Sequence, residues 1–133
     1  MLSVFAIVFQ HALYTFNPKL EKQIVFKDLS LRKQQALYEK KPLYGNVICQ
    51  CEQVSEQEII DAIHSVVGSR TIKGIKKRTS AGGGTCQGGY CQSKVLRIIA
   101  RETNQAVTDI NYDQMHTHIL DKESKVGSWK HMM

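Results

Sequence analysis

Four cysteines, grouped into two close pairs, constrain this 133-residue chain more than any other feature. Cys49 and Cys51 stand one residue apart in VICQCE. Cys86 and Cys91 enclose four residues of the glycine-rich segment AGGGTCQGGYC. Both pairs lie in or beside predicted loops, not on an apolar helical face. This placement indicates that the four thiols act together and that the fold brings the two segments to one site.

Disulfides account poorly for this pattern. Cysteines in a C-x-C arrangement rarely bridge each other, and cytosolic proteins seldom keep disulfides. The opening MLSVFAIVF lacks the basic start and clean cleavage site of a signal peptide, and no apolar run is long enough to span a membrane. The expected compartment is therefore cytoplasmic, where clustered cysteines act as metal ligands.

Two kinds of metal centre are compatible with the spacing. Tetrahedral zinc accepts four thiolates, but its usual C-x2-C knuckles match C-x-C and C-x4-C poorly; zinc can nevertheless fill a thiolate site that lacks iron. A 2Fe–2S cluster is longer than a single ion and takes two thiolates on each iron, which suits two cysteine pairs on separate loops. The pattern favours the cluster, with zinc as the alternative.

Glycines surround Cys86 at a density that excludes a regular helix or strand. Glycine backbone can approach sulfur closely, and successive N–H groups can hold an anion. A flexible loop is the other interpretation, but two cysteines within the same segment argue against it. The predicted supporting residues are Gly82, Gly83, Gly84, Gly88 and Gly89.

Hydrophobic periodicity predicts a mainly α, small α+β fold, with helices over 55–67, 71–79 and 90–103. Ser55 and Glu58 have the spacing of a capping box at the start of the first helix. Val66 and Val67 are expected to extend its apolar stripe. The cysteine loops should converge at one end of the domain, beside two helix N-termini. The expected core residues are Ile59, Ile63, Ile75, Val95 and Ile99.

The chain divides into three predicted parts. Residues 1–41 form an N-terminal arm with short strands at SVFAIVF and QIVFKD and a helix over 31–41 that Ser30 caps and Pro42 ends. Residues 42–110 form the metal-binding domain. Residues 111–133 form a tail or small hairpin, in which His116 and His118 are expected to be solvated.

Positive charge is concentrated beside the glycine-rich segment, in a chain whose formal net charge is +6. Such a face can dock an acidic redox protein or balance the charge of a cluster, and a solvated helix surface is the alternative. Nucleic acid is disfavoured because no aromatic residues interleave with the basic run. The residues concerned are Arg70, Lys73, Lys76, Lys77 and Arg78.

The segments YGNVICQCEQVSEQEIIDAI and TIKGIKKRTSAGGGTCQGGYC resemble the bacterioferritin-associated-ferredoxin-like 2Fe–2S domain. The nearest version stands at the C-terminus of FAD-dependent oxidoreductases of the anaerobic glycerol-3-phosphate dehydrogenase type. The resemblance covers about 26–110 and includes both cysteine pairs. It implies a small, mainly helical domain that serves electron transfer or supports a flavoprotein. The cluster ligands that it implies are Cys49, Cys51, Cys86 and Cys91.

The chain contains no Rossmann fingerprint and no P-loop, and flavin and substrate domains do not accompany the resemblance. FAD is therefore expected only in a missing or partner domain, and dehydrogenase activity is not expected of this chain by itself. The predicted function is an electron-transfer module that is part of, or partner to, such an oxidoreductase. A zinc-stabilised interaction module and a redox sensor are the alternatives.

Overall fold

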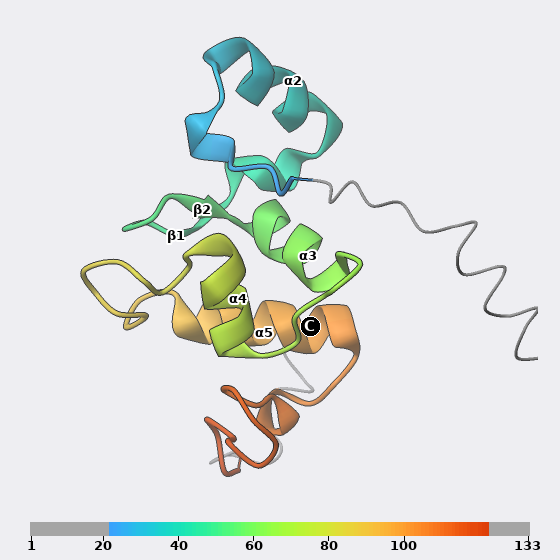
Figure 1. Cartoon of the computed structure of the whole chain (residues 1–133), viewed down its shortest axis with the longest axis vertical. Coiled ribbons are helices and arrows are strands. Elements are labelled where there is room, and N and C mark those ends of the chain that lie inside the picture. The colour runs from blue at the N-terminus through green and yellow to red at the C-terminus, as the bar shows by residue number, and fades with distance from the viewer. Residues whose placement is uncertain (1–21, 123–133) are drawn as a thin grey trace, which may run out of the picture.

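The computed structural model describes residues 22–122, which form a small α+β fold (Figure 1). The two strands pair in one antiparallel sheet, and helices dominate the rest, as the sequence predicts. The strand predicted at SVFAIVF lies outside the described residues. In chain order the elements are η1 (Phe26–Asp28), α2 (Leu31–Lys40), η2 (Pro42–Gly45), β1 (Val47–Cys49), β2 (Val54–Ser55), α3 (Glu56–His64), α4 (Ile72–Thr79), α5 (Gln92–Thr103) and η3 (Val107–Asp109).

The core lies where α3, α4 and α5 pack against one another (Figure 1). Apolar residues at helical spacing face this core, and burial of their side chains supplies the main stabilisation. Ile48 from β1 and Ile110 from the segment after α5 extend it. The predicted core is confirmed in full, because Ile59, Ile63, Ile75, Val95 and Ile99 are all buried.

The first helix of the domain is shorter than predicted. α3 ends at His64, and both Val66 and Val67 are exposed, so their expected inward position is wrong. The chain turns after the helix, because the Ser65 hydroxyl donates to the Ala62 carbonyl oxygen at 3.2 Å and extended backbone follows. By contrast, α4 and α5 begin within two residues of their predicted starts.

The N-terminal arm contains the predicted helix but not the predicted strand at QIVFKD. Residues 22–25 have no regular structure and 26–28 form a 3-10 turn. The backbone N–H of Phe26 donates to Glu58 Oε1 at 3.0 Å instead of joining a sheet, and its ring stacks on Tyr44 at a centroid distance of 5.3 Å. The helix over 31–41 is confirmed as α2, although Ser30 makes no side-chain cap.

Glu58 connects the arm, the sheet and α3. The predicted capping box is present: the Ser55 hydroxyl accepts from the Glu58 N–H at 3.4 Å, and the Ser55 N–H donates to Glu58 Oε2 at 2.7 Å. The same carboxylate accepts the Phe26 N–H. Nearby, the Tyr44 hydroxyl donates to Asp61 Oδ2 at 2.7 Å, and burial, aided by this bond, raises the pKa of Tyr44 well above its usual value. The arm is therefore held against α3 by the Phe26–Glu58 hydrogen bond, and against η2 by the stacking of Phe26 on Tyr44.

The segment that follows η3, around Asn111 and Tyr112, folds back onto α4. A single bridge pairs Asn111 with His118, which gives the hairpin-like tail that the sequence allows. The Lys73 N–H donates to the Tyr112 carbonyl oxygen at 2.8 Å, so this segment covers the first turn of α4. The domain limits at 41/42 and 110/111 stay predictions. No helix among residues 22–122 is both long and apolar enough to cross a membrane.

Replacement of the fully buried Ile59 by alanine should lower the free energy of unfolding by about 2–5 kcal/mol, because the core cannot collapse completely around the lost methyl groups. Urea unfolding followed by circular dichroism measures this change. The matched control is Val67→Ala, which should change stability by less than about 0.5 kcal/mol because Val67 is exposed. Equal losses in the two variants would contradict the shortened α3.

Candidate metal centre

The two cysteine segments meet at one side of the molecule. Figure 1 shows the turn between β1 and β2 on the same side as the loop that joins α4 to α5, coloured yellow. A side chain on Gly84 would place its Cβ only 2.3 Å from the Cβ of Cys51. Atoms that close overlap, so the backbone of the glycine loop lies directly against the first cysteine segment.

The thiols associate across the two segments, not within them. Cys49 adjoins Cys91, whose pKa it helps to raise, and Cys51 adjoins Cys86, whose pKa it helps to lower. Cys49 and Cys91 are each only 1% exposed, whereas Cys51 and Cys86 are exposed. The site therefore consists of an inner and an outer thiol pair, and each pair takes one residue from each segment.

The strand pair explains this separation. Cys49 pairs with Val54 across the antiparallel sheet and faces the core. Cys51 lies in the irregular turn beyond it, where Gln53 takes a left-handed φ of 52°. Because Cys51 is released from the ladder, its side chain faces solvent on the side of Gly84. The C-x-C spacing thus directs one thiol inward and the other outward.

The inner and outer pairs also differ in electrostatics. Burial, followed by the hydrogen bond to Cys49, raises the pKa of Cys91 to about 11. The pKa of Cys86 is lowered, because the backbone N–H of Tyr90, the Cys51 thiol and the Gly88 N–H all donate to its sulfur. The loop therefore supplies N–H donors to Cys86, and these donors stabilise a thiolate.

Within the glycine loop, the sequence analysis missed the part that Gln87 plays. Its side-chain amide donates to the carbonyl oxygens of Gly83 at 3.2 Å and Gly84 at 2.9 Å. Gly82 and Gly88 take φ values of 83° and 87°, which favour glycine. Gln87 closes the loop on itself and so holds Gly84 against Cys51. The sequence does contain a signal for this role: Gln87 directly follows Cys86 and is the one amide side chain in AGGGTCQGGYC.

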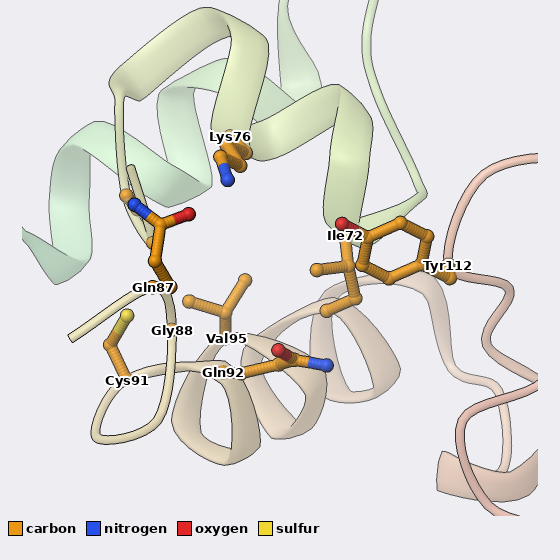
Figure 2. Close-up of a pocket in the computed structure, with 10 residues that line it drawn as sticks. Ile72, Lys76, Gln87, Gly88, Cys91, Gln92, Val95 and Tyr112 are labelled. Carbon is orange, nitrogen blue, oxygen red and sulfur yellow. The ribbon is translucent and has the colours of Figure 1, made fainter. Parts of the chain in front are cut away.

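The five predicted cations do not share one environment. Lys73 is ion-paired with Asp113, and Lys76 is half-buried beside the glycine loop. Figure 2 shows Lys76 on α4 facing Gln87 and Val95 across a small pocket that Cys91 also lines. The remaining three, Arg70, Lys77 and Arg78, are exposed.

Within residues 22–122, no three side chains of His, Cys, Asp and Glu converge on a point that could hold a single metal ion. His116 and His118 are exposed, and their rings lie edge to face at a centroid distance of 6.4 Å. Their expected exposure is confirmed. The lack of a single-ion site in this part of the chain extends to the four cysteines, which adjoin one another in two pairs, so their role as metal ligands stays a prediction.

Residues 47–101 match the family model of the BFD-like 2Fe-2S binding domain. The chain is also similar to a glycerol 3-phosphate dehydrogenase of Caloramator mitchellensis, with 40% identity over 110 residues, which are 83% of this chain and 23% of that protein. It is similar to the hydrogen cyanide synthase subunit HcnB of Pseudomonas aeruginosa, with 44% identity over 59 residues, which are 41% of this chain and 12% of that subunit. The resemblance predicted from the sequence is confirmed.

The chain spans less than a quarter of the length of either relative. Similarity to the dehydrogenase covers 110 residues and so extends beyond 47–101. No solved structure matches the chain.

Gly84→Ala should destabilise the site, because the new Cβ would collide with Cys51 and force the two cysteine segments apart. A backbone shift of this kind costs about 1–3 kcal/mol, measured by urea unfolding. Thr85→Ala is the control, since Thr85 is exposed in the same loop and its loss removes no close contact. Unchanged stability of Gly84→Ala would contradict the close approach.

Proposed function

Because residues 47–101 form a BFD-like 2Fe-2S binding domain, we propose that this chain is an electron-transfer module that holds one 2Fe–2S cluster. The observation that carries the proposal is the approach of the glycine loop to the first cysteine segment at Gly84 and Cys51, which sets Cys91 beside Cys49 and Cys86 beside Cys51. A 2Fe–2S centre takes two thiolates on each iron, so two adjoining thiol pairs are the donor set that it requires.

The surroundings of the thiols support this fit. A thiolate-bound cluster is negatively charged, and the donors that reach Cys86 are backbone N–H groups of the glycine loop. Gly84 leaves the space beside Cys51 free of a side chain. Cys91 stands at the N-terminal cap of α5, where the positive end of the helix dipole opposes the burial that raises the pKa of this thiol.

The inner and outer thiol pairs differ in burial and therefore suit different roles in electron transfer. Such a cluster, when bound, accepts and returns one electron. The buried Cys49 and Cys91 would hold the cluster on the side of the core and keep water from it. The exposed Cys51 and Cys86 would hold it on the side of the surface. Electrons would therefore enter and leave beside the outer pair, where a redox partner can approach most closely.

The partner that we propose is the flavoprotein domain or subunit of an FAD-dependent oxidoreductase. The similar glycerol 3-phosphate dehydrogenase is more than four times as long as the matched region, so a module of this kind there accompanies a much larger part. FAD would belong to that larger part. Arg70, Lys77 and Arg78 are exposed cations that could dock an acidic surface of such a partner.

Anaerobic reconstitution tests the ligand set. The chain should bind two irons and two sulfides and become coloured. Each single Cys→Ala variant should lose most of the cluster, because alanine offers no donor atom; Cys→Ser can retain a cluster with altered absorption, since oxygen is a harder ligand. Iron, acid-labile sulfide and zinc analyses with visible spectra measure these outcomes. The matched control is Ser93→Ala, an exposed position in the first turn of α5.

The zinc alternative has its own signature in the same experiment. A chain that stays colourless with iron and sulfide but binds one zinc would overturn the cluster. Full metal content in all four alanine variants would overturn the shared site itself.

Docking is tested by charge reversal. Lys77→Glu together with Arg78→Glu should slow association with an acidic redox partner and flatten its dependence on salt, because both side chains are exposed. Stopped-flow mixing at low and high salt measures the rate, and the visible spectrum checks that the cluster is intact. The control is Arg32→Glu with Lys33→Glu on α2, an equal change of charge outside the matched domain. Equal rates for both double variants would contradict this docking face.

A further inference from the structure

Lys76 occupies a different position from the other cations of α4. It is half-buried, and its methylene stem lies along a small pocket that Ile72 and Val95 line on the apolar side. The glycine loop forms the opposite side of this pocket, through Gly82, Gly88 and Cys91. Figure 2 shows Lys76 on α4, at the edge of the pocket that Gln87 and Val95 also line.

The end of the Lys76 side chain reaches the glycine loop itself. A Cβ built on Gly83 would lie 3.9 Å from Lys76 Cε, which is ordinary van der Waals contact. Lysine side chains lay their stems on apolar surface and carry the ammonium to the nearest polar region. Here that region is the backbone that encloses Cys86 and leads to Cys91.

No carboxylate among the described residues forms an ion pair with Lys76. Lys73, one turn earlier on the same helix, is paired with Asp113. A half-buried ammonium without a counter-charge is costly unless an anion lies nearby. The nearest groups that become anionic on metal binding are the thiols on the other side of the pocket.

The direction of α4 is a second reason for a cation at this position. The helix ends at Thr79, with Ser80 in a left-handed conformation whose N–H donates to the Lys76 carbonyl oxygen at 2.9 Å. The negative end of the helix dipole therefore points toward the glycine loop, where it would oppose a negatively charged centre. A cation in the last turn offsets this dipole.

We propose that Lys76 sets the reduction potential of the centre held by the inner and outer thiol pairs. This inference rests on the proposed function. Reduction by the flavoprotein partner adds one electron and hence one negative charge. A nearby ammonium stabilises that reduced form more than the oxidised form and raises the midpoint potential. Because Lys76 is half-buried and faces Cys91 across a small pocket, its effect is screened little by salt.

The experiment compares four variants of the reconstituted full chain. Lys76→Met and Lys76→Gln remove the charge with little loss of length, and Lys76→Arg retains it. Lys77→Met makes the same change of charge at the next residue, which is exposed. Midpoint potentials are measured by anaerobic titration with dithionite, followed in the visible spectrum, at low and high salt. Iron and sulfide content are measured for every protein.

Both neutral variants at position 76 should have a lower midpoint potential than the unaltered chain, and the shift should persist at high salt. Lys76→Arg should stay close to the unaltered chain. Lys77→Met should shift the potential less, and that shift should disappear at high salt. Equal shifts for Lys76→Met and Lys77→Met would overturn the proposal, because only general charge would then matter.

Three further outcomes would also overturn the proposal. Loss of the cluster from both neutral variants but not from Lys76→Arg would overturn the proposal, because the charge would then serve assembly of the centre. Absence of iron and sulfide from the unaltered chain would overturn the proposed function together with this inference. A full cluster with an unmoved potential in Lys76→Met would overturn the inference alone.

Discussion

The approach of Gly84 to Cys51 is the contact on which the candidate metal centre depends. It joins two segments that 34 residues separate in the sequence, and it allows no side chain at position 84. Everything around it serves to hold this contact. Gln87 closes the glycine loop by hydrogen bonds to two of its carbonyl groups, and the β1–β2 turn presents Cys51 to the loop. The two pairs of cysteines come together because the glycine loop can approach the first cysteine segment closely at Gly84.

Behind this contact, the three-helix core fixes where the two segments begin and end. The glycine loop leaves α4 and enters α5, so the packing of Ile75 against α5 residues such as Ile99 sets the span that the loop must cross. The first cysteine segment is held from the other side. Glu58 caps α3 through Ser55 and also accepts the N–H of Phe26, so one buried carboxylate joins the sheet, the helix and the N-terminal arm. Loss of this carboxylate would loosen all three.

The role of each cation in this molecule depends on where its side chain lies, more than on how many cations are present. Five cations between Arg70 and Arg78 look like one basic face in the sequence, yet the fold gives them different surroundings. Asp113 neutralises Lys73, solvent surrounds Lys77, and Lys76 lies against the glycine loop. An exposed cation acts on partners through a screened field, whereas a half-buried one acts on what lies beside it. The two proposed roles, docking and control of potential, follow from this difference.

Sequence alone determined the helical core, the capping box and the family, because local spacing decides them. Apolar residues at helical intervals identified Ile59, Ile63 and Ile99, and the cysteine pattern with its glycines identified the 2Fe–2S binding domain. Local spacing gave two wrong predictions. Val66 was expected to face the core, but the helix ends before it and the side chain is exposed. QIVFKD was expected to form a strand, but the Phe26 N–H binds Glu58 instead of a neighbouring strand.

Only the tertiary structure decided which thiols meet and which cation reaches them. Cysteines that are neighbours in sequence face opposite ways, because the strand ladder holds Cys49 in the core and ends before Cys51. Their partners, Cys91 and Cys86, come from the loop between α4 and α5, which is distant in sequence but lies on the same side of the molecule. A linear pattern specifies the residues that can bind a metal, whereas the inner and outer pairs arise from packing between distant segments, which no local spacing records.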